Sequence, residues 1–339
     1  MKIIAELAWG HNGEINQAIK LLHAAKKSGA DLFSIHITDL PSYMAKYYGN
    51  GEGKLSAGRE TLDVYSYLEQ INISENEWVE FSEEARKIGL PLCVMPNDIK
   101  SLIFIESSIH SDYYVVSASC FVEEDLVRSI ARTGKKTFFR IGGAYLGEIE
   151  RAINLFRAEG NFDIVLLHGF QNYPTNLEET NLAFLSTLKN LFNLEVGLAD
   201  HIDGGDDLAM VIPMISLAYG ATYVEKHITL DRNQKSEDFE SALDPEQFAK
   251  MVKYIKSAQI AIGDNFISDL SPATIKYRTV SRKRIVANRN LKKGDRIKLD
   301  DLSFKRCDVG LSPDYLNAIL GRVLLTDINT DDAITFELF

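Results

Sequence analysis

Short apolar runs alternate with longer segments of helical periodicity from residue 2 to about residue 262 of this chain of 339 residues. This alternation is typical of repeated β/α units. The segment after the first run, INQAIKLLHAAKKSG, has helical spacing and ends on the glycine expected at a helix C-cap. We place eight strands at residues 2–8, 31–37, 90–95, 112–117, 136–141, 163–168, 194–199 and 222–228. Eight such units predict an α/β fold in which the strands close into a (β/α)8 TIM barrel.

The alternation of strand-like and helical segments stops after residue 262, and the composition of the sequence then changes twice. Residues 263–280 are rich in Gly, Asp, Ser and Pro, which predicts a linker. Residues 281–339 carry short alternating strands and turn residues, which predicts a small second domain. A segment this short buries little surface alone, so we expect it to dock on a barrel, either its own or that of a partner chain.

Composition narrows the class of protein. Hydrophobic residues at 45% and charged residues at 25% are ordinary for a soluble globular protein, and no apolar run reaches the ~18 residues needed to span a bilayer. Glu6 interrupts the N-terminal apolar stretch, so we interpret it as a strand rather than a signal peptide and expect a cytoplasmic protein. A net charge of −11 disfavours binding to nucleic acid. Cys93, Cys120 and Cys307 are too few and too far apart for a disulfide framework or a cysteine zinc site.

Histidines gather at the carboxyl ends of the predicted strands, where the loops of a parallel barrel meet around one mouth. Five of the seven lie at or just past such an end: His11, His36, His168, His201 and His227. His201 and His227 follow the seventh and eighth strands, which are neighbours, so we expect the two imidazoles to converge on a divalent metal ion. Mn²⁺, Mg²⁺ or Zn²⁺ would suit them. Asp200 and Glu225 could orient the imidazoles or carry protons.

Several motifs at strand ends resemble those of one known family. They are IAELAWGHNG at 4–13, LLHGFQNYPT at 166–175, GLADH at 197–201, GATYVEKHITLDR at 220–232 and SEDFESALDPEQF at 236–248. Together they resemble the sialic acid (nonulosonic acid) synthase family over nearly the whole chain. The tail resembles the antifreeze-like (SAF) module of the β-clip type that closes those enzymes, with residues 305–311 matching a K-R-P-G-x-G-I stretch.

The resemblance implies a homodimer in which each SAF module reaches over the active site of the partner chain. It implies a transferase of sugar-acid or surface polysaccharide biosynthesis that joins phosphoenolpyruvate (PEP) to the open-chain aldehyde of an N-acylated hexosamine and releases phosphate. A divalent metal on the two histidines would act as a Lewis acid toward the aldehyde oxygen. These ligands would be His201 and His227.

The resemblance also assigns site residues. Glu6 matches an active-site Glu beside the sugar aldehyde, where a carboxylate can act as acid or base. Tyr173 and Asp238 match residues that contact the sugar, and Arg306 matches a module residue that reaches the N-acyl group across the dimer.

Four further residues at strand ends or in the loops after them are candidates. We expect Ser117 and Gln171 to contact substrate as well. For His11 and His168 we favour a scaffold role, with the ring bonded to a backbone carbonyl.

The chain departs from the family where the donor should bind. Lysines, hydroxyls and a glutamine of the family pattern are replaced at Ser34, His36, Val94, Met95, Tyr114, Arg140 and Ala199. A phosphate and a carboxylate held in a low-dielectric mouth need cations and donors, so this looks like a depleted PEP site. Arg140 could compensate, because its planar fork can grip a carboxylate or phosphate in bidentate fashion. His36 could be a third metal ligand, or it could hydrogen-bond the sugar.

The sequence is compatible with three functions. The first is a synthase that still accepts PEP or another small anionic donor through Arg140. The second is a divergent paralogue that keeps the metal and the sugar site but does not use PEP, such as an aldolase (lyase) or an isomerase. The third is a non-catalytic carbohydrate-binding or partner-binding barrel. The retained His201, His227, Glu6 and Tyr173 argue against the third.

Overall fold

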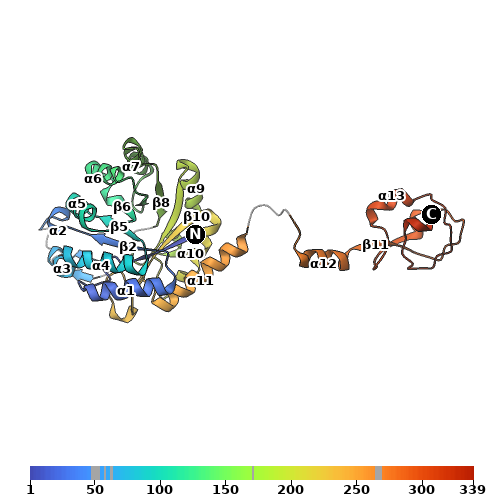
Figure 1. Ribbon diagram of the computed structural model, residues 1–339, viewed down its shortest axis with the longest axis horizontal. Coiled ribbons are helices and arrows are strands. Elements are labelled where there is room, and N and C mark those ends of the chain that lie inside the picture. Colours follow the sequence, from blue (N-terminus) through green and yellow to red (C-terminus); the bar gives the residue numbers. More distant parts are fainter. Residues whose placement is uncertain (47–53, 57–58, 62–63, 170–171, 264–268) are drawn as a thin grey trace. The chain divides into compact units, whose positions relative to one another are not determined.

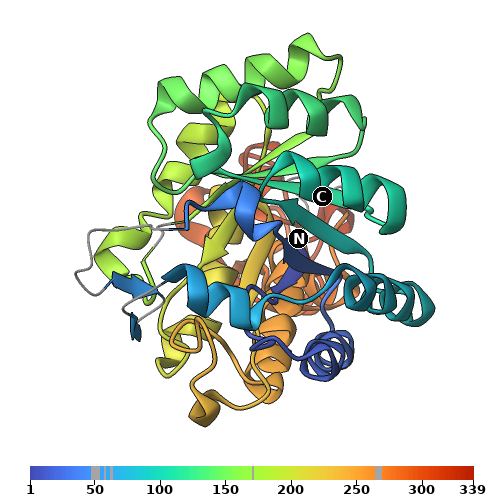
Figure 2. The same ribbon diagram turned by 90° about the vertical axis from the view of Figure 1, so that its left-hand side faces the viewer.

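Eight parallel strands form a closed barrel, as the sequence predicts, with helices on its outside (Figures 1 and 2). The computed structural model describes residues 1–46, 54–56, 59–61, 64–169, 172–263 and 269–339. The strand order around the barrel is β1-β10-β9-β8-β7-β6-β5-β2. These strands are β1 (Lys2–Glu6), β2 (Leu32–Ile37), β5 (Leu92–Pro96), β6 (Tyr113–Ser117), β7 (Thr137–Arg140), β8 (Ile164–His168), β9 (Glu195–Asp200) and β10 (Ala221–His227). Each of them overlaps one of the eight predicted strands.

The helices of the barrel unit begin and end at residues that suit those positions. They are α1 (Ile15–Ser28), α2 (Leu40–Tyr43), α3 (Val64–Ile71), α4 (Glu75–Ile88), α5 (Ile99–Ser108), α6 (Glu124–Arg132), α7 (Leu146–Ala158), α8 (Leu177–Thr180), α9 (Ala183–Phe192), α10 (Ile212–Ile215) and α11 (Pro245–Ile262). Helix α4 starts with a capping box between Ser74 and Glu77. Helix α1 ends at Gly29, whose φ of 92° lies in the left-handed region that glycine tolerates, as the sequence predicted.

A short antiparallel hairpin between β2 and α3 was not predicted. It consists of β3 (Lys54–Ser56) and β4 (Arg59–Thr61). Strands of three residues carry too little alternation to be recognised in a sequence. The hairpin does not join the barrel sheet.

Alternate residues of each barrel strand face opposite layers. Ile4, Phe138 and Tyr223 belong to the small core inside the barrel, whereas Ile3 and Val224 belong to the large core under the helices. This period of two extends to the polar strand ends. It places Glu6, Ser34, His36, Arg140, Glu225 and His227 on the inner side, in phase with Ile4, Leu32, Phe138 and Tyr223. Asp200 and Lys226 share the outer side with Leu198 and Val224.

The chain divides into two compact units, Met1–Gly263 and Asp264–Phe339. The second unit contains the antiparallel pair β11 (Lys283–Ala287) and β12 (Leu302–Arg306) with the short helix α13 (Leu316–Ile319). It has its own apolar core, formed by Ile285, Ala287, Leu291, Ile297, Leu302, Ile319, Leu324, Ile328 and Ile334. Among the described residues, no helix combines the length and apolar character that crossing a membrane requires.

The segment expected to be a plain linker contains a helix, α12 (Pro272–Ser281). The side chain of Ser271 accepts a hydrogen bond from the amide of Thr274, and Pro272 occupies the first turn. None of its side chains is buried. Because the helix covers no core, its sequence has no apolar periodicity, and that signal could not reveal it.

Candidate active site

The carboxyl ends of the barrel strands surround a cavity of about 330 Å³. The residues that line it include His36, Met95, Ser117, Arg140, Tyr173 and Asp238. They come from β2, β5, β6 and β7 and from the loops after β8 and β10. Five of these six are predicted site residues, and the sixth is Met95.

His201 and His227 lie side by side at this mouth. Their ring centroids are 5.3 Å apart, and the ring of Tyr173 lies 4.5 Å from that of His201 and 5.8 Å from that of His227. His201 directly follows β9, and His227 is the last residue of β10. Burial lowers the pKa of His227 well below its ordinary value, and the neighbouring His201 lowers it further. The imidazole of His227 is therefore neutral, which is the form that binds a metal ion.

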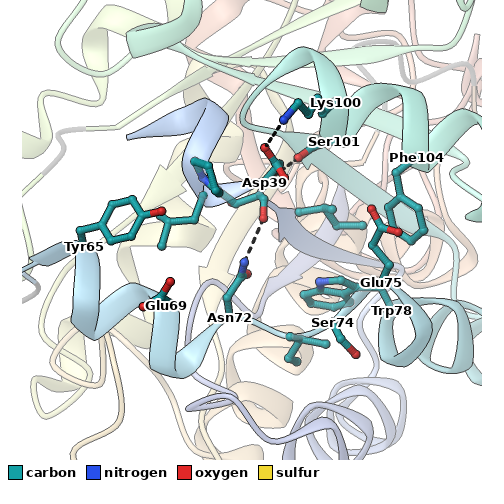
Figure 3. Close-up of a pocket in the computed structure, with 15 residues that line it drawn as sticks. Asp39, Tyr65, Glu69, Asn72, Ser74, Glu75, Trp78, Lys100, Ser101 and Phe104 are labelled. Atoms are coloured by element: carbon teal, nitrogen blue, oxygen red, sulfur yellow. Dashed lines mark hydrogen bonds and ion pairs between the residues drawn. The ribbon is translucent and has the colours of Figure 1, made fainter. Parts of the chain in front are cut away.

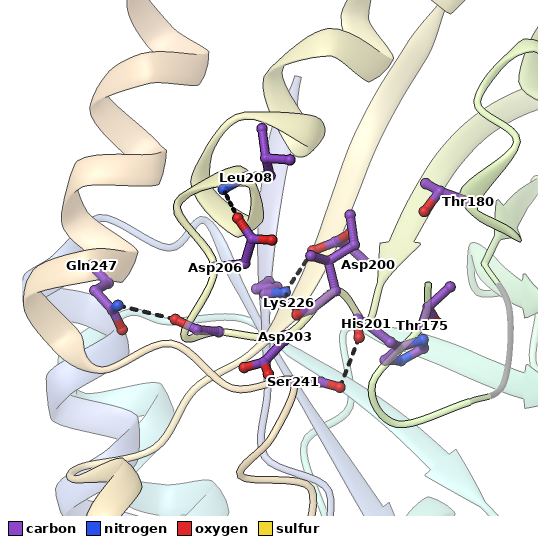
Figure 4. A network of polar contacts seen from close by, with 12 residues as sticks. Thr175, Thr180, Asp200, His201, Asp203, Asp206, Leu208, Lys226, Ser241 and Gln247 are labelled. Carbon is purple, nitrogen blue, oxygen red and sulfur yellow. Dashed lines mark hydrogen bonds and ion pairs between the residues drawn. The ribbon is translucent and has the colours of Figure 1, made fainter. Parts of the chain in front are cut away.

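Hydrogen bonds to the backbone hold His201 in place (Figure 4). Its carbonyl oxygen accepts hydrogen bonds from the amide of Thr175 at 2.8 Å and from the hydroxyl of Ser241 at 2.8 Å. The two donors come from the loops after β8 and β10. Three neighbouring barrel segments therefore meet at this backbone position.

The donor set fits a divalent cation with two protein ligands. Asp238 Oδ2 lies 3.9 Å from His227 Nδ1. Within the described ranges, no three His, Cys, Asp or Glu side chains are grouped as a metal cluster. A cation here would need further ligands from water or substrate. Metal binding by His201 and His227 stays a prediction. The described residues contain no cluster of metal ligands in which His36 would be the third.

Arg140 lies inside the barrel within a cluster of acidic side chains. Its Nη2 atom forms an ion pair with Glu6 and lies 2.9 Å from Glu225 Oε2 and 3.2 Å from Ser34 Oγ. Its Nη1 atom lies 2.9 Å from His36 Nε2, which is also 2.9 Å from Glu6 Oε1. The predicted open fork for a substrate anion is therefore occupied by groups of the chain itself, and His36 is part of the same network.

The two carboxylates of this cluster differ in acidity. Burial raises the pKa of Glu6, but Arg140 and His36 outweigh it, and the net pKa lies well below the ordinary value. Burial raises the pKa of Glu225 to about 7, although Arg140 opposes the rise. Glu6 is thus ionised at neutral pH, while Glu225 can hold or lose a proton there.

Asp200 does not face the two imidazoles of His201 and His227, contrary to our expectation. It faces the layer between the barrel and the helices, where its Oδ2 atom accepts a hydrogen bond from Lys226 Nζ at 2.5 Å (Figure 4). Lys226 also donates to the carbonyl of Ile202 at 2.8 Å. The reason is the period of two, because Asp200, the last residue of β9, is in phase with Leu198 on the outer face, and His201 follows directly after the strand. Glu225 is on the inner face but pairs with Arg140, so neither carboxylate orients an imidazole.

Tyr173 and Asp238 both reach the cavity. Burial raises the pKa of Asp238 to about 7, and the adjacent Glu237 adds to the rise. Asp238 has a φ of 58°, a left-handed conformation that is uncommon outside glycine. Glu237 accepts a hydrogen bond from the hydroxyl of Tyr67 at 2.7 Å, which ties this loop to α3. Sequence reasoning missed Tyr67 and Glu237, because no motif links them.

His11 and His168 have scaffold surroundings. His168 Nε2 lies 3.0 Å from the carbonyl oxygen of Thr180, as expected. His11 Nδ1 instead accepts a hydrogen bond from the amide of Gly13 at 3.0 Å, and its ring packs against Trp9 and Trp78. Burial lowers the pKa of His11 to about 3.

Three other predicted site residues remain, namely Ser117, Gln171 and Arg306. Ser117, the last residue of β6, lines the cavity. Gln171 lies outside the described residues. Arg306 ends β12 in the second unit, where it is exposed, and its predicted contact with the sugar remains a prediction.

A second cavity of about 250 Å³ lies beside the loop that follows β2 (Figure 3). Several of its polar groups are paired with one another. Asn72 donates to the carbonyl of Thr38 at 3.0 Å, and the amide of Asp39 donates to Ser101 Oγ at 2.8 Å. Lys100 Nζ lies 3.3 Å from Asp39 Oδ2. These contacts anchor the loop just beyond His36 and therefore support the mouth from outside.

Comparison with known proteins follows the same division into two units. The model of the NeuB family matches residues 21–266, and the model of the SAF domain matches residues 282–339. A pseudaminic acid synthase of Campylobacter jejuni is 31% identical over 333 residues, which cover 98% of this chain and 94% of the relative. An N,N'-diacetyllegionaminic acid synthase of Legionella pneumophila is 27% identical over 339 residues, 99% of this chain and 93% of the relative.

A solved structure agrees in fold. The N-acetylneuraminic acid synthetase of Leptospira borgpetersenii superimposes with a TM-score of 0.70 at 23% identity, covering 81% of this chain and 90% of that one. At this identity the likeness shows the fold alone. The sequence relationship of the preceding relatives is what carries the comparison of function.

Proposed function

Because the chain belongs to the NeuB family and ends in a SAF domain, we propose that it joins a small anionic donor to the open-chain aldehyde of an N-acylated amino sugar. It is homologous to nonulosonic acid synthases, which are transferases. The observation that carries the proposal is the meeting of His201, His227 and Tyr173 at the barrel mouth. Glu6, an ionised carboxylate on the inner face of β1, completes this group.

Each residue has a stated part in the proposed reaction. A divalent cation on His201 and His227 would supply a Lewis acid for the aldehyde oxygen. Tyr173 and Asp238 would bind sugar hydroxyls, and the Tyr67–Glu237 bond would hold the loop of Asp238 in place. Glu6, which Arg140 keeps ionised, is the inner carboxylate that would accept a proton. Glu225 is the second inner carboxylate, and Asp200 has no part because it faces the helix layer.

The partner proposed for the barrel is a second copy of the chain. Family resemblance supports a homodimer in which Arg306 of one chain contacts the N-acyl group bound at the mouth of the other. The exposed position of Arg306 at the end of β12 is compatible with such a contact.

A second candidate is a paralogue that keeps the metal and sugar site without using PEP. One observation favours it, since both terminal nitrogens of Arg140 already face partners within the chain. A non-catalytic binding barrel is the third candidate. A barrel that only binds ligands would not need an ionised carboxylate beside a pair of imidazoles at the mouth.

The first test is carbon–carbon bond formation. Purified protein is loaded with Mn²⁺, and separately with Mg²⁺ or Zn²⁺, and incubated with N-acetylmannosamine or an N-acylated diamino-trideoxyhexose plus PEP or pyruvate. Mass spectrometry should detect a nine-carbon 2-oxo acid. A metal that binds only the folded state raises the melting temperature of the protein. This increase separates a metal-dependent enzyme from an inert barrel.

Metal binding has a direct test in the paired histidines. His227→Ala should reduce bound metal at least tenfold in elemental analysis, because only one imidazole remains. His168→Gln is the matched control, since His168 also ends a barrel strand but faces the helix layer, and it should leave the metal content unchanged. Equal metal content in both variants would refute the assignment.

A further inference from the structure

The described lining of the cavity at the mouth has little positive charge to offer an anion. Among its described lining residues, Arg140 is the one lysine or arginine. Its Nη1 and Nη2 atoms face His36, Glu6 and Glu225. Its Nε atom has no hydrogen-bond partner, but it is fully buried and is not exposed to a ligand in the cavity. A bidentate grip on a substrate anion would require breaking ion pairs that the chain already makes.

Carboxyl groups surround the same space, and Glu6 is ionised there, while burial raises the pKa of Glu225 and of Asp238 to about 7. Glu6 and Glu225 lie inside the barrel beside Arg140, and Glu237 and Asp238 line the cavity. PEP brings a carboxylate and, in addition, a phosphate ester with about −1.5 to −2 charges at neutral pH. Apart from the proposed divalent cation, an anion of this size would meet among the described lining residues one guanidinium, which the chain already pairs, so much of its charge would remain unpaired.

Neutral hydrogen-bond donors are present instead. Asn97, Ser117 and Ser119 line the cavity. The hydroxyl of Ser119 donates to that of Ser117 at 3.0 Å, which leaves the Ser117 proton free to point elsewhere. Such a set can satisfy one carboxylate, especially beside a bound cation, but cannot neutralise a phosphate.

We propose that the donor is an unphosphorylated 2-oxo acid with a single carboxylate, an inference that rests on the proposed function. Pyruvate is the smallest such acid that can enolise. The methyl carbon of pyruvate loses a proton, which Glu6 accepts. The resulting electron pair forms the bond to the aldehyde carbon. The aldehyde oxygen takes up a proton and becomes a hydroxyl. Every atom of both reactants stays in the product, and nothing is oxidised, reduced or released.

This chemistry has a consequence that the PEP reaction lacks. Loss of phosphate makes bond formation from PEP nearly irreversible, whereas an aldol addition of pyruvate runs in both directions. The same site should therefore cleave a nonulosonic acid into pyruvate and the N-acylated amino sugar. Removal of the hydroxyl proton breaks the carbon–carbon bond, and a proton is returned to the methyl carbon.

Binding is the first measurement. Isothermal titration of the Mn²⁺-loaded full chain with pyruvate and with PEP should give an affinity for pyruvate at least tenfold higher. Equal or tighter binding of PEP would overturn the inference whatever sugar the enzyme prefers. This comparison does not depend on turnover.

Reaction products are the second measurement. N-acetylneuraminate and pseudaminic acid are offered to the metal-loaded protein, and pyruvate is detected with lactate dehydrogenase and NADH. Pyruvate release supports the inference. Phosphate release from PEP in step with a nine-carbon product overturns it but upholds the proposed function. If neither synthesis nor cleavage is found and metal does not bind, the proposed function fails, and the inference about the donor fails with it.

A charge variant sharpens the test. Glu225→Gln removes one carboxylate facing Arg140 at nearly constant shape, so it should raise the affinity for PEP about tenfold and change that for pyruvate much less. Glu195→Gln is the control, because Glu195 begins β9 at the opposite end of the barrel and pairs with Lys136. If Glu225→Gln leaves PEP binding unchanged, the mouth does not exclude PEP by charge and the inference is wrong.

Discussion

The direction in which a side chain leaves its strand decides what each polar residue at this barrel mouth does. His201 and His227 face the mouth, while Asp200 and Lys226, their immediate neighbours in sequence, face the helix layer. Arg140 points inward and is neutralised there by Glu6. One residue along a strand thus separates a group that can meet substrate from a group that stabilises the scaffold.

His11 illustrates a residue whose burial has a measurable pH effect. Its pKa is lowered to about 3 in the folded chain, chiefly by burial, against an ordinary value near 6.5. The unfolded chain therefore takes up a proton at this residue below about pH 6.5, and the folded chain does not. The associated stability is fully present above pH 6.5 and is lost progressively as the pH falls toward 3.

His11→Asn should weaken that pH dependence, because asparagine can still accept the Gly13 hydrogen bond but does not titrate. Between pH 6.5 and 4.5 the free energy of unfolding of the parent should fall by about 2–3 kcal/mol more than that of the variant. Urea unfolding at several pH values measures this. His23→Asn, at a largely exposed histidine, is the control. Parallel curves for parent and His11→Asn would contradict the assignment.

At the scale of elements, the pair between Asp200 and Lys226 joins β9 to β10 (Figure 4), and each of the two residues directly precedes one of the mouth histidines. Both side chains are buried. Burial raises the pKa of Asp200 and lowers that of Lys226, each against the charge of its partner. The pair therefore holds the two strands together only while both charges are present, because either charge buried alone would be unfavourable.

Lys226→Met should destabilise the chain by about 3–5 kcal/mol, because it leaves a buried carboxylate without its cation. The double variant Asp200→Asn/Lys226→Met should recover much of that loss, since no buried charge remains. Chemical unfolding of the three proteins gives the comparison. Arg151→Met at the exposed pair with Glu124 is a control, with an expected change of about 1 kcal/mol or less. A double variant as unstable as Lys226→Met would argue against this account.

At the scale of the whole molecule, two units with separate cores share one chain. The barrel unit contains the mouth, and the SAF unit contains Arg306. If the proposed homodimer is correct, each active site draws on two chains. A subunit that lacks a mouth ligand can then still supply its module to a partner.

Subunit complementation tests this arrangement. Arg306→Ala and His227→Ala should each lower synthesis or cleavage at least tenfold when expressed alone. When the two variants are co-expressed, they should form mixed dimers. Each mixed dimer has one complete site, formed by the intact mouth of the Arg306→Ala chain and the intact module of the His227→Ala chain. The mixed dimers should recover up to about half of the parent activity. Light scattering establishes the dimer. A mixture as inactive as its components would show that each module serves its own chain.

Much of the architecture could be read from the sequence. Eight apolar runs, the spacing between them and the helix-ending Gly29 sufficed for the closed barrel, since these signals are local and repeated. The helix α12 escaped because it buries no face, and the β3–β4 hairpin because its strands are short. The family motifs also brought His201, His227 and Tyr173 to one place.

The sequence by itself determined that polar residues would collect at the carboxyl ends of eight parallel strands, because a strand repeats every two residues and a barrel gathers its loops at one end. Only the tertiary structure decided their partners. A shift of one residue at a strand end exchanges the two faces, so Asp200 turned away from the mouth. The ion pairs of Arg140 join residues 85 and 134 positions away in the chain, distances over which no local pattern carries information.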